Sequence, residues 1–197
     1  MSADFLIFDY ETLSNNPRKA PIVSFGAIIG NWDEVSLDSI QALRDKAFYQ
    51  TYKAKSQADE FGLLPNPETV RWWNSQGESA KALLNSKDKV DVKRHAPDFT
   101  QYCIDGGLTQ KTVVIVRAPH FDVTIMENIF ELTGYPIPYN VFKVRDVRSI
   151  VDARCDTDNG YVPGIRETFA PLGIIEHFAV DDCIKDLIQV KIAMTEY

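Results

Sequence analysis

Two carboxylates end the first hydrophobic segment of this sequence, FLIFDYET at residues 5–12. Residues i and i+2 of a strand share one face, so Asp9 and Glu11 would lie side by side while Tyr10 points to the opposite face. Two like charges so close repel each other, unless one carboxyl group is protonated or a cation lies between them. An Asp-x-Glu triplet more often ends a strand in a polar loop, so the other acidic residues must decide between these interpretations.

Two later segments could bring further carboxylates to the same point. Asp122 comes soon after the β-branched segment TVVIV (112–116), and His177 precedes Asp182 by five residues in EHFAVDDCIKD (176–186). Four converging carboxylates would hold two divalent cations about 4 Å apart, which can activate a water and stabilise the leaving oxygen of a phosphodiester. A neutral imidazole nearby could accept the proton of that water near pH 7.

Each of these residues has a commoner role when it is considered alone. Asp122 could be a helix N-cap, and His177 could be a surface or loop histidine. Trp72 and Trp73 would most often be one buried and one partly exposed ring of a helix, although one ring could stack on a terminal base. The joint arrangement, rather than any single residue, favours an enzyme. Three arginines could contact phosphates, although arginines are solvated by default: Arg117, Arg145 and Arg148.

The apolar pattern predicts an α/β fold, a mixed β-sheet flanked by α-helices, in a single domain over residues 1–197. The first two strands are separated by the turn SNNPRK and are expected to form a hairpin. The predicted strands are residues 5–9, 21–30, 47–53, 112–116 and 139–144. The predicted helices are residues 66–77 (with Asn66 as N-cap and Pro67 at the first helical position), 78–84, 92–104, 121–133, 147–154 and 179–195.

Composition limits the class of protein. The 28 acidic and 21 basic residues give a net charge of −7, which argues against coating long nucleic acid through charge alone. No apolar segment approaches membrane-spanning length, and Asp4 interrupts the only segment that could begin a leader, so a cytoplasmic location is expected. The three cysteines show no metal-binding spacing, which suits a reducing compartment: Cys103, Cys155 and Cys183.

The order Asp-x-Glu, Asp, His-x4-Asp resembles the DEDDh 3′–5′ exonucleases, DnaQ-like relatives of the proofreading subunit of bacterial DNA polymerase with a ribonuclease-H-like fold. The resemblance implies that two Mg²⁺ or Mn²⁺ ions are the cofactors and that His177 is the general base. Its spacing selects Asp182 over the adjacent Asp181. Asp186, one helical turn further on the same face, could contact the metal ligands without binding the metal itself. The implied metal ligands are Asp9, Glu11, Asp122 and Asp182.

Three segments are similar to the phage exonuclease A (DexA) group and its bacterial relatives: ETVRWWNSQGESAK (68–81), RDVR (145–148) and HFAVDDCIKD (177–186). This similarity implies release of nucleoside monophosphates from the 3′ end of single-stranded DNA or RNA, in the host cytoplasm if the protein is phage-encoded. It does not decide whether the protein forms a homodimer, and it implies that the protein does not act at a membrane. The candidate substrate contacts are Thr12, Trp72, Trp73, Arg117 and Arg145.

Two other interpretations remain open at this stage. IFDYETL (7–13) faintly resembles the Asp-x-Asp-x-Thr of haloacid-dehalogenase-type phosphatases, which would form an aspartyl-phosphate on Asp9 and leave His177 without a role. A catalytically inactive relative that binds nucleic acid is the second alternative. The choice between DNA and RNA depends on contacts near the sugar 2′ position, and no residue of the sequence can be tied to it.

Overall fold

A five-stranded mixed sheet forms the centre of the molecule. The structure is a computed structural model and describes residues 2–197. The strand order is β3-β2-β1-β4-β5, and the central β1 pairs antiparallel with β2 and parallel with β4. The predicted mixed sheet and its hairpin are therefore confirmed. The strands are β1 (Phe5–Thr12), β2 (Ile22–Gly30), β3 (Phe48–Thr51), β4 (Val113–Val116) and β5 (Val144–Asp146).

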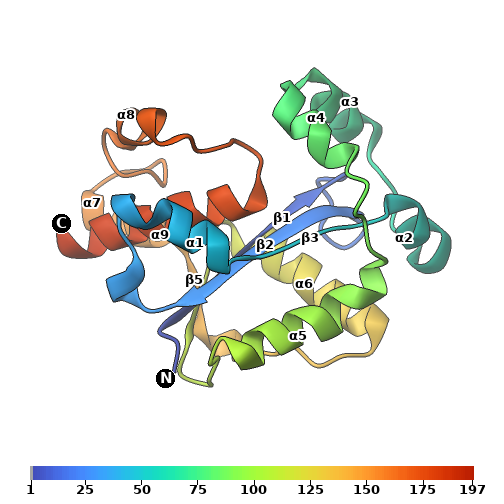
Figure 1. The fold of residues 1–197 in the computed structure, drawn as a ribbon, viewed down its shortest axis with the longest axis horizontal. Coiled ribbons are helices and arrows are strands. Elements are labelled where there is room, and N and C mark those ends of the chain that lie inside the picture. The colour runs from blue at the N-terminus through green and yellow to red at the C-terminus, as the bar shows by residue number, and fades with distance from the viewer. Residues whose placement is uncertain (1) are drawn as a thin grey trace.

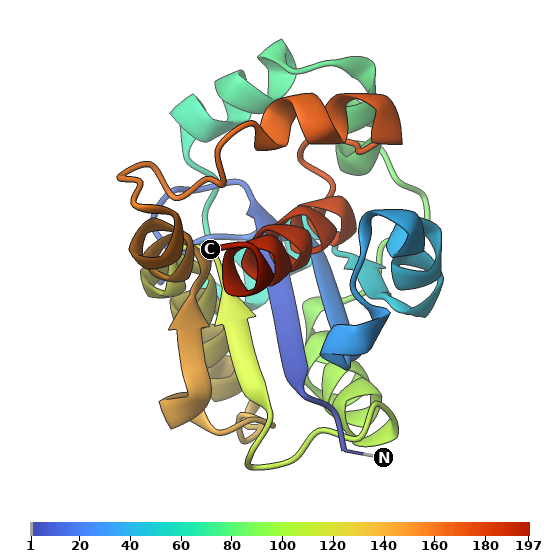
Figure 2. The same ribbon diagram turned by 90° about the vertical axis from the view of Figure 1, so that its left-hand side faces the viewer.

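Helices cover both faces of the sheet (Figure 1). One face, which carries Leu6, Phe8 and Tyr10, packs against α5 (His95–Asp105) and α6 (Pro119–Thr133). The other face packs against three helices: α1 (Ile40–Lys46), α7 (Val147–Cys155) and α9 (Ala179–Thr195). Figure 2 shows α9, in red, lying across the sheet between α1 and α7. No helix within residues 2–197 is long and apolar enough to cross a membrane.

Two strands differ from the predicted ones in their bounds. β1 continues to Thr12 instead of ending at Asp9, because the residues after Asp9 still pair with β2, with Glu11 opposite Ser24. β5 begins only at Val144, because residues 141–143 form a 3-10 turn that the Asn140 side chain caps by accepting the Phe142 amide. Three short helices were not predicted: α1, α2 (Ala54–Phe61) and α8 (Ile165–Phe169).

The predicted tryptophan helix is α3 (Pro67–Ser75), which is followed by α4 (Glu78–Leu84). Its N-cap is confirmed, since the Asn66 side chain accepts hydrogen bonds from the amides of Glu68 and Thr69. Trp73 is buried and its Nε1 donates to the carbonyl oxygen of Thr12 at 2.8 Å. This bond fastens α3 to the end of β1.

Gly26 lets α9 approach the sheet at the point where β2 pairs with Asp9. A Cβ atom at residue 26 would lie 2.7 Å from the carbonyl carbon of Ala179 and 2.7 Å from the amide nitrogen of Val180. The first turn of α9 therefore rests almost directly on the backbone of β2. Any larger residue at this position would force the helix and the strand apart, because both contacts are with backbone atoms.

We predict that Gly26→Ala lowers the free energy of unfolding by about 1–3 kcal/mol, the usual range for overpacking a well-packed site. Because Asp182, which the family resemblance implies as a metal ligand, moves with the first turn of α9, the substitution should also weaken Mn²⁺ binding there. Urea unfolding followed by tryptophan fluorescence, beside calorimetric Mn²⁺ titration, measures both effects. Gly77→Ala is the matched control, since a Cβ there meets nothing within 4 Å. Wild-type stability of Gly26→Ala would contradict this account of the packing.

Candidate active site

The predicted acidic residues and His177 line one cavity of about 790 Å³. Asp9 and Glu11 enter it from β1, and Asp122 enters it from the first turn of α6, just after β4. His177 precedes α9, and Asp182 lies in the first turn of that helix. The structure thus brings together side chains from both halves of the sequence.

Strand alternation positions the first pair of acids as predicted. Asp9 and Glu11 line the cavity; Tyr10 also borders it, but Tyr10 is buried among the apolar residues of the opposite face. The backbone amide of Tyr10 donates to Asp122 Oδ1 at 3.1 Å, which ties the third carboxylate to the same strand. Because α6 begins at Pro119, Asp122 is not the N-cap of that helix, so the commoner role weighed for it is wrong.

A buried histidine anchors Tyr10 from the far side of the sheet. His95 Nε2 lies 2.7 Å from the Tyr10 hydroxyl, and His95 Nδ1 lies 2.6 Å from the Tyr52 hydroxyl. Burial lowers the pKa of His95 to about 3, so the ring is neutral near pH 7 and bonds both tyrosines without carrying charge. This bridge fixes Tyr10, whose backbone in turn holds Asp122.

The two adjacent acids at the start of α9 have different surroundings. Asp181 is fully buried, forms an ion pair with Arg44 at 2.7 Å and accepts the Ile175 amide at 2.7 Å, away from the cavity. Asp182 faces the cavity, where a carboxylate oxygen of Glu11 and of Asp182 and a ring nitrogen of His177 all lie within 4.8 Å of one another. The geometry therefore favours Asp182 over Asp181.

The cavity has an excess of negative groups, since six acidic and three basic side chains line it. Burial, and then the charge of Asp122, raises the pKa of Asp9 well above its ordinary value. Burial likewise raises the pKa of Glu11, and it raises the pKa of Asp122 to about 8. A cation among these oxygens would remove the repulsion, and hard oxygen donors of this kind suit Mg²⁺ and Mn²⁺.

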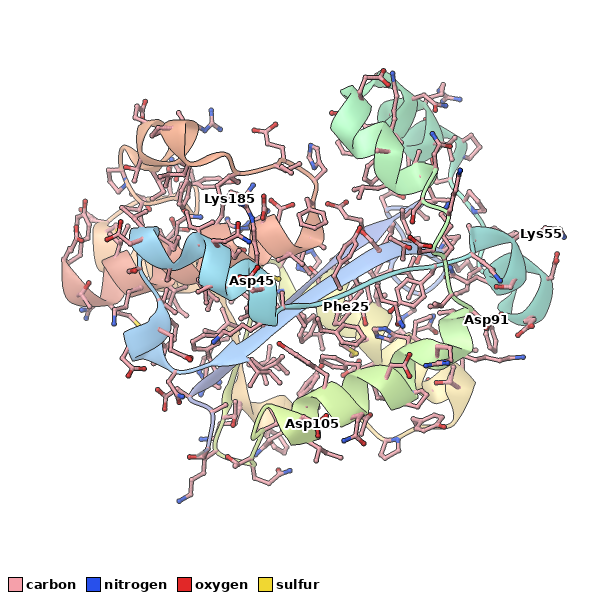
Figure 3. The ribbon with its side chains drawn as sticks, in the orientation of Figure 1. Phe25, Asp45, Lys55, Asp91, Asp105 and Lys185 are labelled. Carbon is pink, nitrogen blue, oxygen red and sulfur yellow. The ribbon has the colours of Figure 1, made fainter. Side chains whose placement is uncertain are left out.

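Two cationic side chains in the cavity are engaged by its acids. Lys185, one turn beyond Asp182, pairs with that carboxylate and rises from α9 (Figure 3). Sequence analysis gave Lys185 no role, although its i+3 spacing from Asp182 was visible. Arg117, predicted to contact phosphate, instead pairs with Asp186 at 2.7 Å, and its guanidinium lies over the Tyr161 ring.

Two of the remaining candidate substrate contacts, Thr12 and Arg145, lie outside the cavity. Thr12 is buried and its hydroxyl donates to the Ser14 carbonyl, while Arg145 donates to the Val144 carbonyl at 2.7 Å; neither lines the cavity. The structure therefore does not bring Thr12 or Arg145 to the site. The prediction of one buried and one partly exposed tryptophan is confirmed, because Trp73 is 1% exposed and Trp72 is 42% exposed.

Comparisons with known proteins show the family and the fold. A family model described as the 3′-5′ exoribonuclease Rv2179c-like domain matches residues 4–194. No curated protein sequence gives a significant match. The match to an exonuclease family leaves the phosphatase and the inactive relative without support, and it agrees with the resemblance to DEDDh exonucleases.

Solved exonuclease I structures share the fold. The zinc-bound complex of E. coli exonuclease I with single-stranded DNA superposes with a TM-score of 0.63 at 16% identity, over 100% of this chain and 41% of that chain. Exonuclease I from Methylocaldum szegediense gives 0.63 at 12% identity, over 100% and 41%. This chain thus spans about two-fifths of the length of those proteins. At such identities the likeness shows the ribonuclease-H-like fold alone.

We predict that the metal-free protein loses stability as the pH rises from about 6.5 to about 8. The native pKa of Asp122, about 8, exceeds its unfolded value of roughly 3.9. Its protonated form therefore stabilises the native state fully below about pH 4, and this stabilisation is lost as the pH rises through about 8. His95 acts in the opposite sense, but only below about pH 6.5. Urea unfolding in EDTA should show a loss on the order of 1–2 kcal/mol across the chosen window.

Asp122→Asn should flatten this dependence and raise the stability of the metal-free protein at pH 8. Millimolar Mg²⁺ should stabilise the wild type more at pH 8 than at pH 6.5, because the cations compete with protons for the same carboxylates. The exposed Asp38→Asn serves as the control. A stability that rises with pH in EDTA would show that the acids do not repel one another as described.

Proposed function

This chain belongs to the Rv2179c-like 3′-5′ exoribonuclease domain family and is a 3′–5′ exonuclease, and on that premise we propose how it acts. It removes nucleoside monophosphates one at a time from the free 3′ end of single-stranded nucleic acid, with two divalent cations and a histidine general base. The observation that carries this proposal is the gathering of four carboxylates and one imidazole around a single cavity. The tryptophan segment 68–81 further suggests a closer kinship with the phage exonuclease A group.

The proposed metal ligands are Asp9, Glu11, Asp122 and Asp182. Their oxygen donors, their mutual repulsion and the excess of acids over bases in the cavity all fit a pair of Mg²⁺ or Mn²⁺ ions. Such ions, when bound, stabilise charge on the scissile phosphate and on the leaving oxygen. The protein's own contribution is to hold the four carboxylates in place before the substrate arrives.

His177 is proposed to take the proton of the attacking water at a ring nitrogen. As the water oxygen bonds to phosphorus, the bond from phosphorus to the 3′ oxygen of the preceding nucleotide breaks. That oxygen leaves with a proton from solvent, so the products are a nucleoside 5′-monophosphate and a chain with a new 3′ hydroxyl. Lys185 pairs with Asp182 in this structure; were that carboxylate to hold a cation, the ammonium group would be available to a non-bridging phosphate oxygen.

The substrate is proposed to be single-stranded, and both DNA and RNA are candidates. The solved relatives include E. coli exonuclease I bound to single-stranded DNA, whereas the family description names an exoribonuclease. A net charge of −7 suits a site that grips a chain end locally better than one that wraps long duplex.

We expect activity to require Mg²⁺ or Mn²⁺ and to disappear in EDTA. His177→Ala should retain Mn²⁺ binding while single-turnover digestion slows by about 10²–10⁴-fold, the usual contribution of a general base. Asp9→Asn and Asp182→Asn should lose both metal binding and turnover. Calorimetric Mn²⁺ titration beside rapid-quench digestion separates the two groups of variants.

His120→Ala is the matched control, because His120 is an exposed histidine outside the cavity lining. Asp181→Ala would leave Arg44 without its ion-pair partner and is expected to lower stability. Wild-type turnover by His177→Ala, or full activity in EDTA, would refute the mechanism.

End-labelled oligonucleotides test the direction of cleavage and the substrate. A 5′-labelled single strand should shorten in one-nucleotide steps, and a blocked 3′ hydroxyl should slow the reaction. Duplex with blunt ends should be a poorer substrate, and RNA compared with DNA of the same sequence measures the sugar preference. Efficient cutting of a circular single strand would rule out a strict exonuclease.

A further inference from the structure

The ring of Trp72, which does not itself line the cavity, packs against the imidazole of His177, which does. Their ring centroids lie 4.8 Å apart with the planes at 81°, an edge-to-face arrangement. Trp72 is 42% exposed, so its large ring is not needed to fill the core. The contact joins α3 to the segment that enters α9, and both lie at the same end of the sheet in Figure 1.

Besides Trp72, the His177 ring has a longer edge-to-face contact with Trp73 and lies near the carboxylates of Glu11 and Asp182. His95 is clamped by two tyrosine hydroxyls, but within residues 2–197 no hydrogen bond of this kind reaches the His177 ring. Its backbone is left-handed, with φ of 58°, a conformation that a non-glycine residue keeps only when its surroundings enforce it. α3 supplies two rings to those surroundings, Trp72 at 4.8 Å and the buried Trp73 at 6.3 Å between centroids, and Trp72 is the nearer.

α3 is itself fixed to the strand that carries Glu11. Trp73 donates from Nε1 to the Thr12 carbonyl at 2.8 Å, and the Asn66 amide donates to the Leu13 carbonyl at 2.7 Å. The position of Trp72 is therefore set relative to the end of β1 rather than to the loop that contains His177.

We infer that Trp72 is a positioning residue, whose ring holds the His177 imidazole where a ring nitrogen can reach the attacking water. This inference rests on the proposed role of His177 as general base. A base that rotates freely must find its reactive orientation in every turnover, whereas a packed ring begins close to it. The alternative is that Trp72 stacks on a nucleobase, which would act on substrate binding instead.

A double-mutant cycle separates these roles. Single-turnover digestion at saturating and at low substrate is measured for Trp72→Ala, His177→Ala and the double variant. We expect Trp72→Ala to lower the maximal rate about 10–100-fold with little change in KM, since small misplacements cost up to about 10²-fold. The double variant should be no slower than His177→Ala alone, because a positioning residue has no effect once its target is gone.

Two further variants distinguish a loss of His177 positioning from a general loss of stability. Trp72→Phe retains an aromatic ring against His177 and should recover most of the lost rate, and Phe142→Ala, at an 85%-exposed ring outside the cavity lining, should match the wild type. Calorimetric Mn²⁺ binding and thermal unfolding of Trp72→Ala should be close to those of the wild type.

Each other outcome overturns the inference in a recognisable way. A raised KM with an unchanged maximal rate, additive with His177→Ala, would assign Trp72 to base stacking. A wild-type Trp72→Ala beside a slow His177→Ala would refute the positioning role and leave the general base intact. A wild-type rate for His177→Ala would refute the general base, and the inference about Trp72 with it.

Discussion

The close approach of α9 to β2 over Gly26 is the contact on which the site depends. Asp9 lies opposite Gly26 in the ladder, and Asp182 follows the touching residues of α9 by one turn or less. The missing side chain therefore sets how near the last carboxylate comes to the first. The same contact of α9 with β2 also fixes the position of Asp186 on α9. Asp186 forms an ion pair with Arg117, which directly follows β4, so this pair holds the end of β4 against α9. A packing constraint thus sets the spacing of the proposed metal ligands.

The fold holds together groups that repel one another. Burial and neighbouring charges raise the pKa of Asp9, Glu11 and Asp122. Among the side chains that the structure describes, only Lys185 forms an ion pair with one of the proposed ligands. The energy to maintain this arrangement comes from elsewhere, including the apolar packing on both faces of the sheet and the His95 bridge behind Tyr10. Sites that preorganise charge in this way commonly sacrifice stability for function.

Local pattern was enough to place the first pair of acids, because strand alternation depends only on neighbouring residues, whereas the selection of Asp122, Asp182 and His177 came from the family resemblance. Strand alternation put Asp9 and Glu11 on one face and Tyr10 on the other, as the structure has them. Features that depend on distant partners were missed. The extension of β1 past Asp9 needs β2 beside it, and the capture of Arg117 by Asp186 joins residues far apart in sequence. Short helices such as α1 and α8 depend on packing more than on propensity, so their sequences carry little signal.

The distribution of the carboxylates along the chain has a consequence for its biosynthesis. Three of them lie on β1 and at the start of α6, whereas Asp182 and the histidine before it come with the final helix described here. During translation the earlier segments leave the ribosome first. Until α9 has emerged and docked, the nascent chain lacks both groups, and one face of its sheet is uncovered. In this order of synthesis, the proposed active site stays incomplete beside the messenger and transfer RNA of the translating ribosome until α9 has docked.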